Sequence, residues 1–187
     1  MFRPLFVIFG LFTLITGVAY PLIVTVVAQT AMPSAANGSL IVRDDKIVGS
    51  SLIGQQFDDA KYFWNRPSAT TPGYNGASSS GSNQGPTNPD LHKAIAERVE
   101  TIRKAHPEKT GPIPVDMLTA SASGLDPHIT PAAAEFQVER IAKERALPVE
   151  AVRKLVTESI EGRTLGLLGE ARVNVLNLNR KLDGMKP

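Results

Sequence analysis

The stretch LFVIFGLFTLITGVAYPLIVTVVA, residues 5–28, decides how this chain is organised. It is almost pure hydrocarbon, and no charged residue occurs between Arg3 and Arg43. At about 1.5 Å per residue, a helix of this length would cross the roughly 30 Å apolar core of a bilayer with its backbone groups bonded internally. We therefore predict one membrane-spanning helix near the N-terminus.

A cleaved signal peptide is the competing interpretation of this segment. Its apolar region would be shorter, would follow a positively charged region and would end at an Ala-x-Ala-like site. Only Arg3 precedes the run, and AQTAM, residues 28–32, matches such a site poorly, so we favour a retained anchor. Arg3 also favours an N-terminus in the cytoplasm. Gly10 and Gly17 lie a heptad apart on one face, where they either admit another helix or have no special role.

The rest of the chain follows from this anchor. Residues 1–33 are predicted to form the cytoplasmic N-terminus and the membrane helix, and residues 34–187 an extracytoplasmic soluble domain. The chain contains no cysteine, which excludes disulfides, thiolate metal sites and cysteine nucleophiles. A net charge of +2 without a basic tract gives no reason to expect a nucleic-acid partner.

The soluble part predicts an α+β domain with three or four helices and a few short strands. Residues 40–42 and 46–48 are β-branched and apolar around the turn residues RDD, which is typical of a hairpin. A helix is expected from Pro89, with Asn88 as its N-cap, and another from Pro131, with Thr130 as its N-cap. A short buried strand is expected at residues 115–118.

The C-terminal third predicts one further helix and one ambiguous segment. Val149, Val152, Val156 and Ile160 would face inward, and Gly162 would end the helix. In the tail, residues 171–183, Val173 and the asparagines alternate as in a strand, whereas the leucines repeat as in a helix.

Residues 67–89, PSATTPGYNGASSSGSNQGPTNP, are nearly all Gly, Ser, Thr, Asn and Pro. This composition is typical of a flexible linker, yet so long a structureless stretch inside a domain is unusual. The alternatives are a disordered loop and a functional loop ordered by a partner. The aromatic run just before it, which includes the single Trp64, is expected to belong to the core.

Residues 119–137, TASASGLDPHITPAAAEFQ, place Ser121, Ser123, Asp126 and His128 close together, as if in a hydrolase. Near sequence neighbours rarely converge as a triad, and no G-x-S-x-G motif is present. Asp126-Pro127 is better interpreted as a turn. The three histidines lack metal-ligand spacing and are expected to be surface or capping groups. GASSSGSNQG lacks the lysine of a phosphate-binding loop.

Several long blocks resemble one family in order and over nearly the whole chain. They are GSSLIGQQF, YFWNRPSA, GASSSGSNQGPTNPDL, IPVDMLTASASGLDPHITPAAAEFQVERIA and GRTLGLLGEARVNVLNLN, after one N-terminal membrane helix. On these blocks the chain is similar to the C subunit of the Kdp-type potassium-transporting P-type ATPase. The spacers between the blocks are free to vary.

The resemblance implies a non-catalytic accessory subunit of a potassium uptake pump in the cell inner membrane. Its partners would be a channel-like potassium-binding subunit, a P-type ATPase subunit, a small single-helix subunit and membrane lipid. It would assemble and stabilise the complex and act as a catalytic chaperone that raises ATP affinity. No cofactor would be bound covalently, since ATP and K⁺ are handled by the complex. The alternative is a stand-alone membrane-anchored periplasmic hydrolase or scaffold.

With this resemblance, the polar segments 67–89 and 119–137 are expected to be ordered contact surfaces. If the soluble domain lies outside the cell, where ATP is scarce, coupling to ATP affinity must be indirect. The residues predicted to contact or couple to a partner are Asn83, Gln84, Gly85, Ser121, Ser123, Asp126, Pro127, His128 and Gln137.

Overall fold

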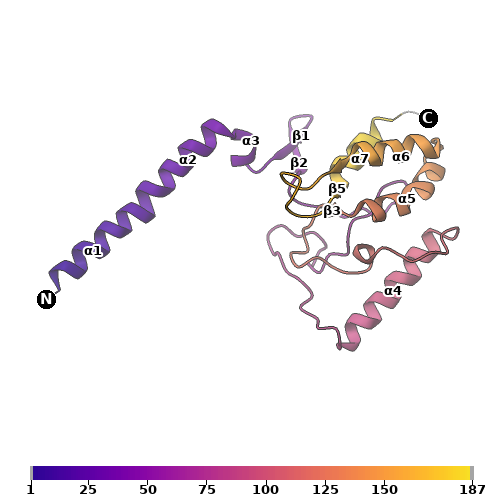
Figure 1. Cartoon of the computed structure of the whole chain (residues 1–187), viewed down its shortest axis with the longest axis horizontal. Coiled ribbons are helices and arrows are strands. Elements are labelled where there is room, and N and C mark those ends of the chain that lie inside the picture. The colour runs from indigo at the N-terminus through magenta and orange to yellow at the C-terminus, as the bar shows by residue number, and fades with distance from the viewer. Residues whose placement is uncertain (1, 186–187) are drawn as a thin grey trace. The chain divides into compact units, whose positions relative to one another are not determined.

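The computed structural model describes residues 2–185 and consists of two compact units, which meet between Ser50 and Ser51 (Figure 1). The predicted boundary after residue 33 marks the end of the apolar segment, whereas the hairpin that follows belongs to the first unit.

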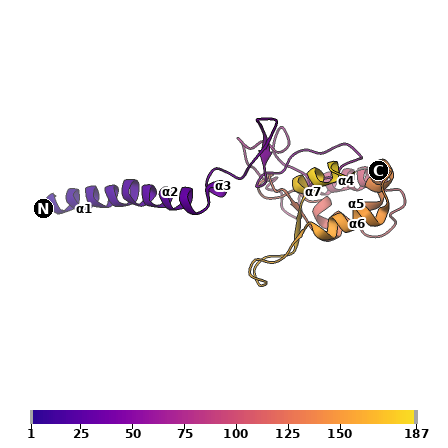
Figure 2. The ribbon, with the colours of Figure 1, turned by 90° about the horizontal axis from the view of Figure 1, so that it is seen from above.

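The first unit begins with a continuous helix over Arg3–Ala31, the one candidate membrane span among the described residues (Figure 2). It comprises α1 (Arg3–Leu14), a π-helical turn (Ile15–Ala19) and α2 (Tyr20–Ala31). Pro21 has no N–H to donate and its ring crowds the preceding turn, so the wider turn just before it lets the helix continue. No residue of the helix Arg3–Ala31 is buried, as expected for a helix that faces lipid.

A short helix and the predicted hairpin complete this unit. Helix α3 (Pro33–Ala36) precedes the antiparallel strands β1 (Leu40–Arg43) and β2 (Lys46–Ser50). Asp44 and Asp45 have φ of 50° and 58°, the geometry of a type I′ turn, which matches the twist of the strands. The hairpin prediction is confirmed.

The second unit packs helices around a small antiparallel sheet. Its helices are α4 (Pro89–Ala105), α5 (Pro131–Glu144), α6 (Val149–Glu158) and α7 (Val175–Asp183). The sheet has the order β3 (His128–Ile129), β5 (Arg172–Asn174), β4 (Ile160–Glu161). The α+β prediction is confirmed, and α4 and α5 begin where their caps predicted. Asn88 accepts the Asp90 N–H at 2.9 Å and Thr130 accepts the Ala133 N–H at 3.1 Å.

Helix α5 is the centre of the core. Ala133 and Ala134 are fully buried and, being small, let neighbouring elements approach closely. Val138 and Ile141 continue the same buried face. The other large, fully buried apolar side chains around it are Phe63, Val152, Val173, Val175, Leu178 and Leu182.

The strand predicted at residues 115–118 is wrong. Val115–Met117 form a 3₁₀ turn, and the Val115 side chain is 70% exposed. Asp116 is held by another element: its carboxylate accepts the Thr130 N–H at 2.7 Å and the Thr130 hydroxyl at 3.2 Å. This link to the start of α5 outweighs the strand preference of the valine.

The predicted inward face and end of the third helix are partly wrong. Helix α6 ends at Glu158, before Gly162, and Ile160 pairs with Val173 in the sheet. Val149 and Ile160 are exposed, so only Val152 and Val156 of the predicted stripe are buried. Both alternatives for the tail occur, because β5 leads directly into α7, where Asn174 accepts the Asn177 N–H at 3.0 Å.

Candidate functional site

The polar loop, residues 67–89, is folded onto residues 119–128 of the predicted contact segment. The Ser68 hydroxyl donates to the Gly124 carbonyl at 2.7 Å. The Ser80 N–H and the Ser79 hydroxyl both donate to the Ser123 carbonyl, at 3.0 and 2.9 Å. The two segments that the sequence singles out therefore form one surface.

Hydroxyl side chains also hold the loop to itself. The Ser68 hydroxyl accepts the Tyr74 N–H at 3.0 Å. The Thr70 hydroxyl donates to the Pro72 carbonyl at 2.9 Å and accepts the Asn75 N–H at 3.0 Å. Irregular backbone must find partners for its polar groups, and short Ser, Thr and Asn side chains supply them. The composition that suggests a linker therefore also suits an ordered irregular loop.

Two glycines allow this close approach. A Cβ atom on Gly124, whose φ is +66°, would lie 2.7 Å from the Ser80 carbonyl oxygen and from a Thr70 methyl group. A Cβ atom on Gly81 would lie 2.8 Å from the Ala122 carbonyl oxygen. These separations are too short for any side chain, so the surface depends on glycine at both positions.

The serines and the histidine of the suspected triad have separate partners. Ser121 accepts the Gly124 N–H at 2.9 Å, and Ser123 accepts the Leu125 N–H at 3.1 Å. The His128 ring lies against Asp126, with Nδ1 3.4 Å from Oδ1. The serine hydroxyls thus serve the turn, and this arrangement supplies no nucleophile–base pair from these residues.

Asp126 joins the turn to the loop. Its Oδ1 accepts the His128 N–H at 3.0 Å, which forms the predicted turn at Asp126-Pro127, and its Oδ2 lies 3.1 Å from Arg66 Nη1. Burial alone would raise the pKa of the Asp126 carboxyl, but the hydrogen bonds from His128 and the charge of Arg66 outweigh it and lower that pKa. Pro127 is buried, and its carbonyl accepts the Val175 N–H at 2.9 Å, linking the turn to α7.

Asn83, Gln84 and Gly85 lie at the outer edge of this surface. Asn83 is exposed with φ of +53°, a left-handed conformation that asparagine tolerates better than most residues. Gln84 is half-buried, and a Cβ atom on Gly85 would meet nothing within 4 Å. Their role in partner contact stays a prediction.

Gln137 is fully buried and clamps the aromatic run. Its Oε1 accepts the Trp64 N–H at 2.7 Å, and its Nε2 donates to the Trp64 carbonyl at 3.2 Å. Asn179 holds Phe63 in the same way, with both bonds at 2.9 Å. An effect of Gln137 on a partner must therefore pass through the segment that it holds.

Arg140 is a buried charged residue that the sequence analysis did not identify. It is 5% exposed, and the partners that the described residues offer it are neutral: His106, Gln137 and the carbonyls of Ala60 and Tyr62. Its guanidinium also stacks 4.2 Å from the centre of the Trp64 ring. Burial lowers the pKa of Arg140 to about 10.

The prediction that each histidine is a surface or capping group is met at His106 by the second alternative: it is the C-cap residue of α4, and it is fully buried. Arg140 Nε donates to His106 Nε2 at 2.9 Å, so Nδ1 must carry the proton, which it donates to the Ile102 carbonyl at 3.0 Å. Burial, together with the charge of Arg140, lowers the pKa of His106. Its position four residues after Ile102, in line with the apolar stripe and one residue past the end of α4, was the available signal.

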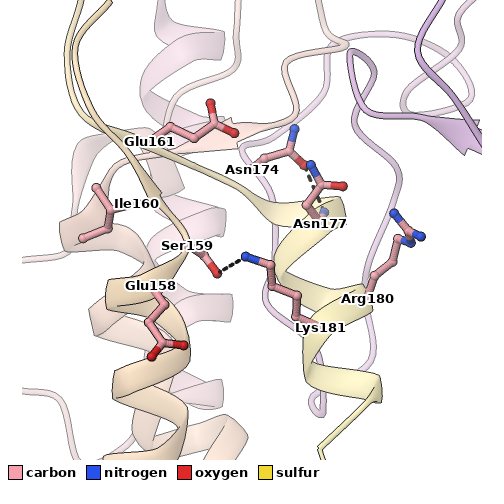
Figure 3. Close-up of a pocket in the computed structure, with 8 residues that line it drawn as sticks. All are labelled: Glu158, Ser159, Ile160, Glu161, Asn174, Asn177, Arg180 and Lys181. Atoms are coloured by element: carbon pink, nitrogen blue, oxygen red, sulfur yellow. Dashed lines mark hydrogen bonds between the residues drawn. The ribbon is translucent and has the colours of Figure 1, made fainter. Parts of the chain in front are cut away.

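A pocket of about 400 Å³ lies between the end of α6 and α7 (Figure 3). Lys181 Nζ donates to the Ser159 hydroxyl across it at 3.2 Å. Figure 3 shows Glu158 on the α6 side and Arg180 on α7, so the lining carries both charges. None of the predicted contact residues lines this pocket.

An apolar N-terminal helix followed by a small α+β unit defines a class of protein with one candidate membrane anchor and a compact soluble part. The model of the KdpC family, described as K⁺-transporting ATPase, c chain, matches residues 2–184. The chain therefore belongs to this family, which confirms the resemblance found in the sequence.

Curated relatives agree with this assignment. The relative from Polaromonas naphthalenivorans is 58% identical over 186 residues, which cover 99% of this chain and 95% of the relative. Those from Sorangium cellulosum and Methylococcus capsulatus are each 55% identical, over 98% and 99% of this chain and 97% and 98% of the relative. All three bear the name Potassium-transporting ATPase KdpC subunit.

Proposed function

We propose that the chain is a non-catalytic accessory subunit of an ATP-driven potassium uptake pump. It would assemble with a channel-like potassium-binding subunit, a P-type ATPase subunit and a small single-helix subunit, and stabilise their complex. The observation that carries this proposal is the family match over residues 2–184. Potassium-dependent ATPase activity of membranes with and without the chain tests it: we expect activity to be lost without the chain, and unchanged activity would contradict the proposal.

We further propose that the N-terminus is cytoplasmic and the second unit extracytoplasmic. The positive charge of Arg3 at the start of the helix supports this orientation, because the helix carries no other charge. Because the chain has no cysteine, single cysteines report on sidedness without background. With a membrane-impermeant thiol reagent on spheroplasts, Val115→Cys should be labelled and Phe2→Cys protected. The reverse pattern would contradict the orientation.

The proposed effect on the pump is a rise in ATP affinity through indirect coupling. A subunit on the outer side cannot touch cytoplasmic ATP, but it can favour one state of its partners, and linkage then changes their affinity for nucleotide. The missing phosphate-binding motif supports an indirect route. We expect the chain to lower the ATP concentration at half-maximal pump activity, while the purified chain alone binds no ATP. Nucleotide binding by the chain alone would refute indirect coupling.

The surface formed by residues 67–89 and 119–128 is our proposed partner contact for this coupling. At its outer edge Asn83 and Gly85 are exposed and Gln84 is half-buried, and the segments beneath are fixed by hydrogen bonds. The double variant Asn83→Ala/Gln84→Ala should weaken complex assembly or potassium-dependent turnover while leaving the fold intact. The control Lys93→Ala changes an exposed residue of α4, outside this surface, and should leave assembly and turnover unchanged. Unchanged assembly and turnover in the double variant would count against this contact.

A further inference from the structure

His106 and Arg140 form a buried pair whose hydrogen bonds fit only the neutral histidine ring. Arg140 Nε donates to His106 Nε2 at 2.9 Å, and His106 Nδ1 donates to the Ile102 carbonyl at 3.0 Å. Each ring nitrogen is therefore occupied, one as an acceptor and one as a donor. A second proton on the ring would remove the acceptor, and it would place two N–H groups and two positive charges against each other across the same short distance.

The surroundings of the pair do not neutralise a second positive charge. Charged groups reach it from every element around it: Glu108 and Lys109 after α4, Glu144 on α5 and Asp59 on the turn before the aromatic run. Asp59 is paired with Lys61, and none of the carboxylates within residues 2–185 forms an ion pair with His106 or Arg140. A protonated His106 would therefore be an uncompensated charge beside a buried guanidinium, which is costly unless water reaches both.

The pair holds the side chain of Trp64. The Arg140 guanidinium stacks 4.2 Å from the centre of the Trp64 ring, and the His106 ring meets the same ring edge-on at 5.9 Å. Arg140 also donates to the Ala60 carbonyl, and Trp64 Nε1 donates to the Asp59 carbonyl at 3.1 Å. The indole and the turn at residues 59–60 are thus fastened to α5 through one guanidinium.

Other hydrogen bonds limit what this fastening can release. The Phe63 backbone is held on both sides by Asn179, and the Trp64 backbone is held by Gln137. These bonds do not involve His106, so they survive its protonation. The Trp64 side chain is only half-buried, and it can leave α5 without opening the core around Phe63.

We propose that His106 and Arg140 form an acid-sensitive latch on Trp64: a proton on His106 breaks its bond with Arg140, and the indole moves away from α5 together with residues 59–60. Water then reaches both cations, which relieves their repulsion. Because His106 is fully buried, a proton reaches it only when the latch is open, and the protonated ring keeps it open. Neutral pH closes the latch again.

The latch depends on the fold of the second unit and not on the proposed pump. In the orientation proposed above, this unit would meet the pH outside the cytoplasm. Burial lowers the pKa of His106, and the charge of Arg140 lowers it further, so the latch is closed near neutral pH and opens only in acid.

The other two histidines do not have this property. His128 lies 3.4 Å from an Asp126 oxygen and 3.7 Å from a Glu161 oxygen, so a proton on its ring would strengthen its contacts. His92 is exposed on α4 and has room for water around its ring. His92 therefore provides a matched control on the helix that His106 caps.

The test follows Trp64, the only tryptophan, in the full chain in detergent micelles. As the pH falls from about 8 to about 5, we expect its emission to shift to the red and its quenching constant with acrylamide to rise about twofold, with a midpoint below about 6.5. The far-ultraviolet circular dichroism should stay constant, because the helices remain. Quenching that is unchanged until the helices melt would overturn the latch. So would dimmer emission without better quencher access, because the ring would then titrate without releasing Trp64.

Two variants separate His106 from the other groups that titrate. His106→Gln keeps a donor and an acceptor but binds no proton, and it should abolish the acid transition of Trp64. His92→Gln, the same substitution at the exposed position, should leave the transition as in the wild type. An acid transition that persists in His106→Gln would contradict the proposal.

Nitrogen NMR of the histidine-labelled wild-type chain gives a second measurement, which needs no change at His106. We expect the Nδ1–H form of its ring at neutral pH and a protonation midpoint that coincides with the Trp64 transition. His92→Gln and His128→Gln identify the signals of the other two rings by their loss. The Nε2–H form, or midpoints more than about one pH unit apart, would overturn the proposal.

Discussion

Two segments of the second unit behave differently from what their compositions suggest. They are the polar loop, residues 67–89, and the leucine arm, residues 162–171 between β4 and β5. Residues 67–89 have the composition of a flexible linker, yet Ser68 and Ser80 bond to the segment 119–128, and Thr70 holds the loop to itself. Residues 162–171 are rich in leucine, yet the leucines point away from the core. Hydrogen-bond partners and close backbone contacts therefore decide which segment is part of the folded unit, and composition alone does not.

The largest effect is expected from a substitution that separates the polar loop from residues 119–128. In Gly124→Ala, the new methyl group would overlap the Ser80 carbonyl at 2.7 Å and φ would stay positive. We expect the free energy of unfolding to fall by about 2–3 kcal/mol. The measurement is urea unfolding of the full chain in detergent micelles, followed by fluorescence of Trp64, the only tryptophan. Gly85→Ala, which meets nothing within 4 Å, is the control and should be neutral.

Removing the Gln137 side chain, which holds Trp64 just before the polar loop, should lower the free energy of unfolding by nearly as much. Gln137→Ala leaves the Trp64 N–H and carbonyl without the buried side chain that now pairs with both. We expect a loss of about 2 kcal/mol in the same unfolding assay, with a red-shifted Trp64 emission in the folded baseline. Gln84→Ala, on the half-buried outer edge, provides the comparison. Equal stability of the Gln137 variant and the wild type would show that the clamp is unimportant.

Acid should destabilise the second unit through His106, which bonds to Arg140 and packs against Trp64, just before the polar loop. Its pKa in the folded chain lies below the ordinary value near 6.5, so the unfolded chain binds more protons between the two values. The contribution to stability is complete above pH about 6.5 and is lost as the pH falls toward the folded pKa, by at most about 1.4 kcal/mol per pH unit. Unfolding measured across this range checks the slope. His106→Gln, which keeps a donor and an acceptor but does not titrate, should flatten it; an unchanged slope would contradict the assignment.

The leucine arm should show the smallest effect on stability. Leu167→Ser replaces a side chain that is 80% exposed, and we expect the free energy of unfolding to change by less than about 0.5 kcal/mol. The same urea assay measures it. A loss as large as that of Gly124→Ala would show that the arm is part of the core and would remove the contrast between the two regions.

Local signals were enough to predict much of the fold. The apolar run, the hairpin turn and the caps at Asn88 and Thr130 depend on neighbours in sequence, and the structure has a long apolar helix, a hairpin and two capped helices at these places. The failures depend on distant residues. Asp116 bonds to Thr130, which sets a 3₁₀ turn in place of a strand, and β5 draws Ile160 out of the helix.

The candidate site divides in the same way. The turn at Asp126-Pro127 was predictable because its side chain bonds to a backbone group two residues on. The bonds of Arg140 to His106 and of Gln137 to Trp64 join residues far apart in sequence, and no pattern within one segment reveals them. The exposure of Leu165, Leu167 and Leu168 likewise depends on which elements surround residues 162–171.

Affinity purification of the tagged full chain from membranes in mild detergent tests the central claim most directly. We expect both large subunits of the potassium pump to elute with the wild-type chain in constant proportion. Elution of the chain alone, while the two large subunits purify together without it, would contradict its role as a subunit of the complex.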